Sequence, residues 1–543
     1  MRPNLPPSLF ATSRTILNLR AEIAGATGLS FVAPLSRGAG AAVWRRGTGA
    51  RLLPLSGRPV VLVEPGPLLS PYDTPETGLA SLRLAIGGRP IGGHALGADL
   101  ISLLRAHRLA HVVADEDAAP ILPEEQPSDA ALLARTYGAG VHYFDPWTRR
   151  PIDFRDCVER VAWLRDRFAG NDRRVVYVGM SRWKRPAMDV FGAGPWGRPI
   201  HTMKAEDAVE QGRRHGGQVL AWATRAPQQL ERLCAEAGLP LARVEDGFIR
   251  SVGLGASLQP GASIVVDDLG IYYDPRRESR LARLLAEAQF PAELVARGKA
   301  LRESIVARRL SKYNVGLAGS GADWPAGRRI VLVPGQVEDD ASVLHGSPHV
   351  RSNRALLEAA RARNPDAFLL FKPHPDVEAG FRVGAIPEAE ALRLADRIVS
   401  GISIVDLLDR VHHVETMTSL AGFEALIRGL TVAVHGRPFY AGWGLTEDLA
   451  PGADRGRRLA LDELAAAALI LYPRYLDPVA MKPCTPEHLL DRLSEARDLA
   501  PASALSIGRA RQLFMRARYA VVNPILRRLR ARRGVARGPS DKR

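Results

Sequence analysis

The sequence predicts an α/β protein in which two Rossmann-like lobes face a central cleft. The chain has 543 residues, too many for a single ordinary domain. From about Arg173 onward, short apolar and β-branched runs alternate with helical stretches of ten or more residues. This alternation is typical of parallel sheets covered by helices. Two such sets, joined near residues 312–327, account for the two lobes.

In the first set, strands and helices are expected to alternate up to an acidic motif. The expected elements are strands at Val175–Val178 and Gln218–Trp222, a helix at Gln228–Ala237, and a strand at Leu241–Val244. The last strand leads into Glu245-Asp246-Gly247. The glycine is expected to adopt a backbone turn that other residues cannot.

The second set has the same pattern. The expected strands are Ile330–Pro334, Ala367–Lys372, Val411–Val414 and Thr431–Val434, and the expected helices are Val350–Arg363 and Leu420–Arg428. Ligands of parallel sheets bind beyond the carboxyl ends of the strands. The residues that follow these strands are therefore the candidates for a binding site.

An internal repeat bears on the N-terminal part. Tyr143-Phe144-Asp145-Pro146 and Tyr475-Leu476-Asp477-Pro478 are each followed, after four residues, by a proline and then by an expected helix. The second copy closes the two-lobed region, so the first would close a preceding one. Residues 1–140 contain neither a Glu-Asp-Gly turn nor a His-Pro pair, and we interpret them as a possible remnant of a preceding module. Chance similarity of two turns is the alternative.

These observations predict four segments. They are an N-terminal extension at 1–140, a first Rossmann-like lobe with the acidic motif at 141–320, a second Rossmann-like lobe at 321–500, and a basic tail at 501–543. The motifs described below make the first lobe the candidate for the acceptor side and the catalytic Asp, and the second the candidate for binding a CMP-sugar.

The charge is concentrated at the C-terminus. The chain carries +16, and residues 509–543 contain twelve Lys and Arg against one Asp, which is +11 of that total. With its interspersed apolar residues, such a tail suits an anionic membrane surface. A solvated arginine-rich end is the alternative reading. Nucleic acid is not expected as a partner, because the aromatic interleaving of a base-stacking platform is missing.

The cellular compartment is predicted from what the sequence lacks. Three scattered cysteines do not have metal-ligand spacing, and the N-terminus has no signal-peptide core. No run approaches about 18 uninterrupted apolar residues. We therefore expect a cytoplasmic protein, and the basic tail would associate it peripherally with an anionic membrane surface, the inner membrane if the resemblance described below holds.

The acidic motif is the first candidate for chemistry. A carboxylate of Glu245 or Asp246 could act as base on an acceptor hydroxyl or as nucleophile on an anomeric carbon. Adjacent carboxylates repel, so one of them is expected to have a raised pKa. The following glycine-rich loop, which contains Arg250, could hold an anionic sugar. An ordinary surface turn is the alternative.

The second candidate is Lys372-Pro373-His374-Pro375, which follows an apolar strand. Lys372 and His374 can both donate to phosphate oxygens, and the prolines fix the loop. A donor that departs as a nucleotide monophosphate needs its developing charge stabilised in this way. A structural histidine in a rigid loop is the alternative.

Two further segments complete the predicted donor site. Thr418 and Ser419 precede a helix whose amides could bind phosphate, and Glu424 could accept from ribose hydroxyls. Simple N-capping would look the same in the sequence. Gly335 and Gln336 follow the first strand of the second lobe. The nearby acidic pair Asp339-Asp340 lacks an Asp-x-Asp pattern beside a strand, so no metal and no other cofactor is expected.

Taken together, these motifs resemble the capsular polysaccharide β-Kdo transferases of Gram-negative bacteria, the KpsC type. The similarity extends over about residues 143–496. The shared stretches are 244–255, 266–274, 311–314, 333–342, 364–367, 372–376, 416–424 and 438–444.

The resemblance implies a GT-B fold, CMP-β-Kdo as donor and a lipid-linked acceptor, a Kdo-primed phosphatidylglycerol, at the cytoplasmic membrane face. It implies net retention through a glycosyl adduct on Asp246 and contact of His374 with the CMP phosphate. Full-length members have two modules in tandem, of which only the C-terminal type is complete here. We therefore expect other Kdo transferases of the capsule pathway as partners.

Two alternatives stay open. One is a transferase of the same fold with another CMP-sugar donor, such as CMP-sialic acid. The other is a catalytically inactive factor for capsule assembly or export, against which the intact acidic and His-Pro motifs count.

Overall fold

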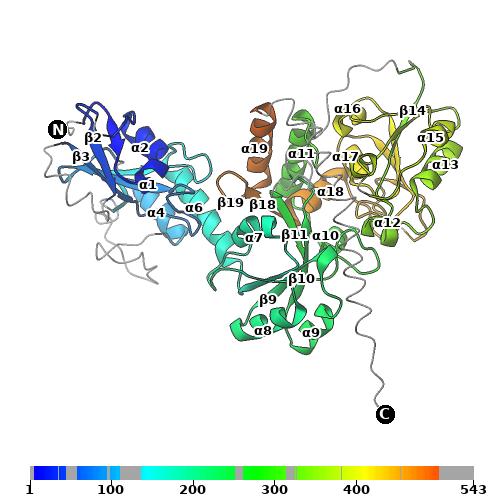
Figure 1. Ribbon diagram of the computed structural model, residues 1–543, viewed down its shortest axis with the longest axis horizontal. Helices are drawn as coiled ribbons and strands as arrows, with labels where there is room; N and C mark the ends of the chain where they lie inside the picture. Colours follow the sequence, from blue (N-terminus) through cyan, green and yellow to red (C-terminus); the bar gives the residue numbers. More distant parts are fainter. Residues whose placement is uncertain are drawn as a thin grey trace, which may run out of the picture. The chain divides into compact units, whose positions relative to one another are not determined.

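The computed structural model describes residues 5–34, 36–44, 58–93, 98–109, 136–250, 261–312, 324–325, 327–380, 382–452 and 454–499. The glycine-rich loop at 251–260 and the basic tail lie outside these residues. The described chain forms two compact units. The first comprises Met1–Arg174, Pro186–Pro199 and Leu476–Cys484, and the second comprises Val175–Arg185, Ile200–Tyr475 and Thr485–Arg543. Both are mixed α/β structures (Figure 1).

The first unit contains one mixed sheet. The elements of this unit are β1 Leu9–Ala11, α1 Arg14–Asn18, α2 Arg20–Thr27, β2 Gly40–Trp44, β3 Val60–Pro65, β4 Ser81–Ile86, β5 Arg89–Pro90, α4 Ala98–Ala106, β6 Val141–Tyr143, α6 Phe154–Ala169 and β19 Lys482–Cys484. The mixed sheet consists of β1 to β6. Strands β1, β2 and β3 are parallel, whereas β4 is antiparallel to β3, β5 and β6.

The first sheet of the second unit carries the acidic motif. Its elements are β7 Val175–Val178, η2 Arg182–Lys184, β8 Ile200–Thr202, α8 Ala205–His215, β9 Gln218–Trp222, η3 Ala223–Arg225, α9 Leu230–Glu236, β10 Leu241–Asp246, β11 Ser263–Asp267, α10 Arg280–Glu287, α11 Ala292–Ala307 and β18 Pro473–Asp477. Helix α7, Arg185–Phe191, spans the boundary of the two units. The strand order of the seven-stranded sheet is β8-β7-β9-β10-β11-β18-β19, of which β19 and the last two residues of β18 belong to the first unit.

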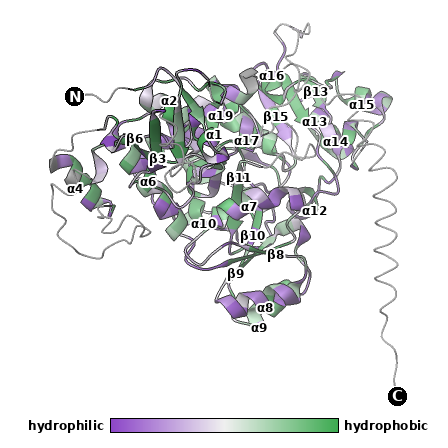
Figure 2. Cartoon of the chain, turned by 60° about the vertical axis from the view of Figure 1, so that its left-hand side comes forward, coloured by the Kyte–Doolittle hydropathy of each residue, from purple (hydrophilic) through white to green (hydrophobic). Residues whose placement is uncertain are grey.

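This sheet differs from the expected parallel one. Strands β8, β7, β9 and β10 are parallel, but β11 runs antiparallel to both β10 and β18. Pairing with β11 also extends β10 through Glu245 and Asp246, which were expected to lie in a turn after the strand. Helices on this sheet are amphipathic: α8 buries Ala205, Ala208 and Gly212 and carries charged residues elsewhere (Figure 2).

The second sheet of the second unit is parallel throughout, as expected, with order β14-β13-β12-β15-β16-β17. Its elements are β12 Ile330–Pro334, α12 Ala341–Gly346, α13 Asn353–Arg363, β13 Phe368–Lys372, α14 Pro375–Glu378, α15 Glu388–Leu394, β14 Arg397–Ile398, α16 Ile404–Leu408, β15 His413–Thr416, α17 Leu420–Leu426, β16 Thr431–Val434 and β17 Glu447–Asp448. The chain continues through α18 Leu461–Ala466, the π-helical turn Ala467–Leu471 and α19 Pro486–Leu499.

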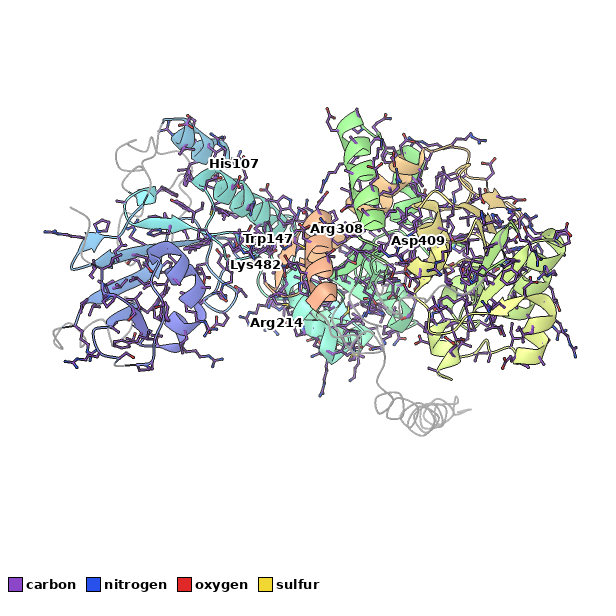
Figure 3. All side chains as sticks on the ribbon, turned by 90° about the horizontal axis from the view of Figure 1, so that it is seen from above. His107, Trp147, Arg214, Arg308, Asp409 and Lys482 are labelled. Atoms are coloured by element: carbon purple, nitrogen blue, oxygen red, sulfur yellow. The ribbon has the colours of Figure 1, made fainter. Side chains whose placement is uncertain are left out.

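The sequence repeat is also a repeat of conformation. Oδ1 of Asp145 accepts hydrogen bonds from the amides two and three residues later, and Oδ1 of Asp477 does the same. Four residues after each aspartate, Arg149 and Met481 both have positive φ, 63° and 51°. Within the first unit the two copies touch, because Nε1 of Trp147 donates to the Pro483 carbonyl, close to Lys482 (Figure 3).

Candidate functional site

The carboxyl end of β10 presents two carboxylates in different surroundings. Lys184 Nζ lies 2.9 Å from Asp246 Oδ1, and Arg250 Nε lies 2.9 Å from Asp246 Oδ2. Burial alone would raise the pKa of Asp246, but the charges of Lys184 and Arg250 outweigh it and lower that pKa. Asp246 is therefore held ionised.

The pKa of Glu245 is shifted in the opposite direction. Burial, and then the negative charge of Asp246, raise the pKa of Glu245 to about 7. Its Oε1 accepts a hydrogen bond from the Asp246 amide at 3.2 Å, whereas its buried Oε2 has no hydrogen-bond partner among the residues that the structure describes. Neighbouring carboxyls whose pKa values are driven apart are typical of sites in which one group is a nucleophile and the other exchanges a proton.

Gly247 is required for a different reason from the one expected. The glycines with positive φ in the described chain do not include Gly247, so no left-handed turn is involved. Instead, a Cβ at this position would lie 2.3 Å from Oγ of Ser263 on β11. The Gly247 amide also donates to the Ser263 carbonyl at 3.1 Å. Close approach of two strands explains the glycine.

The predicted phosphate loop lies at the carboxyl end of β13. Lys372 is only 8% exposed, and burial lowers the pKa of its ammonium, with Glu378 opposing. A buried cation in such surroundings favours an anionic ligand. His374 is the N-cap of α14, and its Nδ1 accepts from the Asp376 amide at 3.1 Å. This assignment leaves the proton of the neutral ring on Nε2.

The Gln336 side chain connects two loops of the second sheet through hydrogen bonds. Its side-chain oxygen accepts from the Thr418 amide at 2.9 Å and its Nε2 donates to Thr418 Oγ1 at 3.0 Å. The Gly335 amide donates to the Lys372 carbonyl at 2.8 Å. Of the predicted donor residues, the structure therefore brings Gly335, Gln336, Lys372 and Thr418 into one hydrogen-bonded group.

The remaining predicted residues lie on two helices. Ser419 caps α17 through its side chain, and Pro375 is the first residue of α14. Glu424 is buried on α17, and its Oε1 accepts from the Lys312 amide at 2.8 Å. Burial raises the pKa of Glu424.

Three links join the acidic strand end to the second sheet. The Tyr273 hydroxyl has a pKa raised by burial and then by the charge of Glu245, and Asp340 adds to this effect. Asp340 also acts on His374: burial lowers the pKa of the His374 ring, and the negative charge of Asp340 opposes this lowering. The Lys312 ammonium offsets part of the burial that raises the pKa of Glu245 and Glu424, and it adds to the charges that lower the pKa of Asp246, so it lies near all three carboxyls.

The third link is aromatic. Phe248 stacks on Phe439 with ring centroids 4.7 Å apart and meets Phe423 of α17 at 5.9 Å. An apolar cavity beside these rings also reaches Lys312 and Glu424. Its lining residues are Phe248, Ile249, Ile305, Leu310, Ser311, Lys312, Leu420, Phe423, Glu424, Ile427, Leu469 and Leu490.

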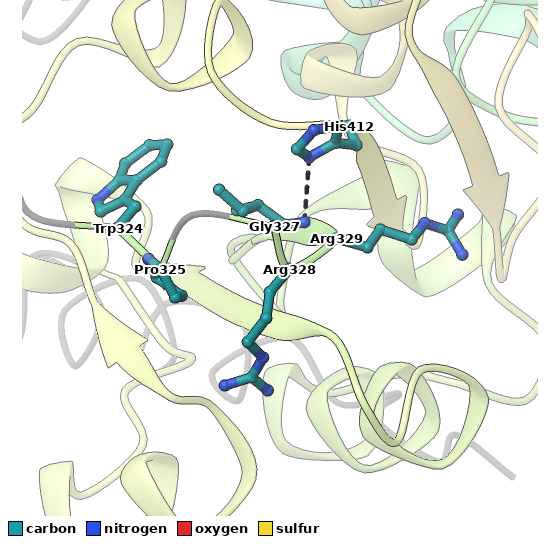
Figure 4. Close-up of a pocket in the computed structure, with 7 residues that line it drawn as sticks. Trp324, Pro325, Gly327, Arg328, Arg329 and His412 are labelled. Atoms are coloured by element: carbon teal, nitrogen blue, oxygen red, sulfur yellow. Dashed lines mark hydrogen bonds between the residues drawn. The ribbon is translucent and has the colours of Figure 1, made fainter.

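A second pocket lies elsewhere. It is lined around the start of β12 by Trp324, Arg328, Arg329 and His412, whose Nδ1 accepts from the Ile330 amide at 3.1 Å (Figure 4). Because Gln336 and Lys372 lie at the carboxyl ends of the strands, this pocket is separate from the predicted site.

No cluster of three or more His, Cys, Asp and Glu that could hold a metal ion occurs among the described residues. Within the same residues, no helix combines the length and hydropathy that a bilayer crossing requires. Lys184 and Lys312 are site residues to which the motifs assigned no role. Lys312 lies within a shared stretch, whereas nothing in the sequence marks Lys184.

The chain is similar to known proteins of capsule polysaccharide biosynthesis. The family described as "Capsule polysaccharide biosynthesis protein" matches residues 217–475. The capsule polysaccharide modification protein LipA of Neisseria meningitidis is 39% identical over 350 residues, 64% of this chain and 49% of LipA. The lipopolysaccharide-processing protein LpsZ of Rhizobium meliloti is 44% identical over 257 residues, 47% of this chain and 58% of LpsZ. The chain thus spans about half the length of these relatives.

Solved structures extend the comparison. The β-Kdo 2,4 transferase of Thermosulfurimonas dismutans KpsC is 32% identical, with a TM-score of 0.52, over 59% of this chain and 98% of that one. The β-Kdo 2,7 transferase of the same KpsC is also 32% identical, with a TM-score of 0.49, over 60% and 99%. These similarities show that the chain belongs to the family of KpsC-type capsule polysaccharide proteins.

Proposed function

We propose that the second unit is a retaining β-Kdo transferase of GT-B architecture, which moves Kdo from CMP-β-Kdo to a Kdo-primed phosphatidylglycerol. The observation that carries this proposal is the contrast between the two carboxyls at the end of β10. Asp246 is ionised between two cations, whereas the pKa of Glu245 is raised to about 7. Such a pair suits a double displacement.

In the first step, an Asp246 carboxylate oxygen attacks the anomeric carbon. The bond from that carbon to the phosphate oxygen breaks, and its electron pair leaves with CMP. Lys372 and the Nε2 proton of His374 stabilise the charge that develops on the phosphate. No metal is needed for this stabilisation if these two groups supply it.

In the second step, the acceptor hydroxyl attacks the same carbon and the bond to Asp246 breaks. Two inversions at one carbon give net retention. Glu245 can exchange a proton near neutral pH, which suits it to take the proton of the incoming hydroxyl. Gln336 and Thr418 would position the nucleotide, and Glu424 would accept from its ribose.

The decisive experiment uses the donor alone. Incubation of the full chain with CMP-Kdo should release CMP and add the mass of one sugar to the protein, with the added mass on the peptide that contains Asp246. Asp246→Ala should show neither effect while it still binds CMP. Transfer that persists in Asp246→Ala would exclude the nucleophile role, and CMP release only from another CMP-sugar would change the donor. The matched control is Asp189→Ala, a carboxylate on α7 outside the site.

The acceptor implies association with the membrane, for which the basic tail is the candidate. Deletion of residues 509–543, which carry +11, should lower binding to anionic vesicles more at low salt than at high salt, because exposed charges are screened. Equal loss at both salt concentrations would instead indicate an apolar anchor.

A further inference from the structure

Lys184 is a buried cation beside Asp246 that no motif predicted. It ends the short turn η2 after β7, and its residue is 8% exposed. Besides its 2.9 Å contact with Asp246 Oδ1, its Nζ lies 3.3 Å from the ring centroid of Trp222 and 5.1 Å from that of Trp183. Two aromatic faces and one carboxylate therefore fix the ammonium.

The first unit contains a copy of this part of the fold. Its strands β1-β2-β3-β4-β6 have the same order and directions as β7-β9-β10-β11-β18. The registers also agree. On β3, Val63 pairs with Trp44 as Val244 pairs with Trp222, and on β4, Ser81 pairs with Tyr143. Ser263 of β11 pairs with Tyr475 in the same way.

This correspondence places Glu64-Pro65-Gly66 where the second unit has Glu245-Asp246-Gly247. A Cβ on Gly66 would lie 2.4 Å from Ser81 Oγ, just as a Cβ on Gly247 would lie 2.3 Å from Ser263 Oγ. The Gly66 amide donates to the Ser81 carbonyl, which repeats the contact at Gly247. Thus residues 1–140, which lack a Glu-Asp-Gly sequence, contain its structural equivalent.

The charged residues differ as a set between the two copies. Pro65 replaces Asp246, and Leu69, three residues after the glycine, replaces Arg250. Ile16 is the third residue after Ser13, the N-cap of the helix that follows β1, and Lys184 is the third residue after Ser181, the N-cap of the turn that follows β7. Ile16 and Leu69 belong to one apolar cluster.

Electrostatics explains why these charges are absent together. A buried ion pair can be exchanged for apolar groups, but removal of one partner leaves the other charge unpaired in a poorly solvated place. The copy without Asp has neither the Lys nor the Arg. Lys184 and Arg250 therefore serve as counter-charges of Asp246, and the fold itself does not require them.

The proposed reaction changes that charge. When an Asp246 oxygen bonds to the anomeric carbon and CMP departs with the electron pair, the carboxylate becomes a neutral ester. Lys184 and Arg250 would then lack their counter-charge. A sugar acid carries its own carboxylate on the reacting carbon and can replace it, whereas a neutral sugar cannot.

We propose that Lys184 is a positioning and specificity-determining residue: it holds Asp246 ionised and aligned before attack, and it pairs with the carboxylate of the sugar acid once Asp246 is esterified. This inference rests on the proposed function. Among the described residues, the charged groups besides Lys184 that face Asp246 are Arg250 on the following loop, Lys312 after α11 and Glu245 on the same strand.

The test compares Lys184→Met and Lys184→Arg with Arg182→Met, an exposed control on the same turn. The readout is the pH profile of CMP release from CMP-Kdo in single turnover. Lys184→Met should lower the rate about 100-fold at pH 7 and displace its acid limb upward by about 1 to 3 pH units. Lys184→Arg should recover part of both effects, and Arg182→Met should match the wild type.

A Lys184→Met protein that binds CMP normally and keeps the wild-type acid limb would overturn the inference. CMP titration shows whether each variant is folded, and the arginine variant tests the same point if methionine is not tolerated. Failure of the proposed function looks different, because the wild type itself would then release no CMP from CMP-Kdo, or Asp246→Ala would remain active.

Discussion

Replacement of Glu245 by glutamine gives the sharpest test of the site's electrostatics. Burial and the neighbouring Asp246 raise the pKa of Glu245 from 4.5 to about 7. Well below pH 4.5 the carboxyl is protonated in both the folded and the unfolded chain, so it contributes no difference. As pH rises, the unfolded chain loses this proton first, and the folded state becomes progressively less favourable.

The magnitude follows from the two pKa values. A change from 4.5 to about 7 corresponds to about 3 kcal/mol of lost stability above pH 7, at about 1.36 kcal/mol per pH unit. At pH 5 the loss is only about 1 kcal/mol. Glu245→Gln removes this penalty, so the variant should be more stable than the wild type at pH 8 by up to about 3 kcal/mol, which corresponds to a rise in Tm on the order of 5 °C.

Thermal unfolding at pH 5 and pH 8 measures this difference. The control is Glu231→Gln, an exposed carboxyl whose pKa is lowered first by its hydrogen bond to Arg277. The effect of Glu231 on stability has the opposite sign. A carboxyl whose pKa is lowered by folding stabilises the folded state at pH values above its pKa in the unfolded chain, so Glu231→Gln should lose stability at pH 8. If wild type and Glu245→Gln have parallel pH dependences, the explanation of the Glu245 environment is wrong.

Three further outcomes follow from the same geometry. Lys372→Met should weaken CMP binding about tenfold to a hundredfold, since hydrogen bonds to charged groups contribute about 1.5–3 kcal/mol; an unchanged titration would remove Lys372 from the phosphate site. Gly247→Ala should destabilise the second unit because its Cβ would lie 2.3 Å from a side-chain oxygen of the next strand, and an unaltered Tm would contradict this. Because Pro65 replaces Asp246 in the first unit, donor alone should add at most one sugar per chain, and a second adduct in the mass spectrum would disprove it.

Several strands could be predicted from the sequence because their signals are local. Val175–Val178, Gln218–Trp222, Ile330–Pro334 and Thr431–Val434 coincide with β7, β9, β12 and β16. Each is a short run rich in apolar residues, typical of buried parallel strands. The motifs after them were likewise visible, since ligand-binding residues of such sheets follow the strand ends.

Other features depend on partners that are distant in the chain. The sequence did not predict that β11 is antiparallel, because tertiary pairing sets the direction of a strand. The same pairing with β11 extends β10 through Glu245 and Asp246. Lys184 was missed because 62 positions separate it from Asp246, and a lysine after a strand has no signature of its own.

The sequence by itself therefore determined the α/β class, the family resemblance and the two groups of candidate residues, because short-range patterns encode them. Only the tertiary structure decided which cations neutralise Asp246 and that Glu64-Pro65-Gly66 is the counterpart of the acidic motif. Register and hydrogen bonding keep a fold recognisable after its side chains have changed. The charges that the two copies do not share are the ones to which the proposed reaction assigns a role.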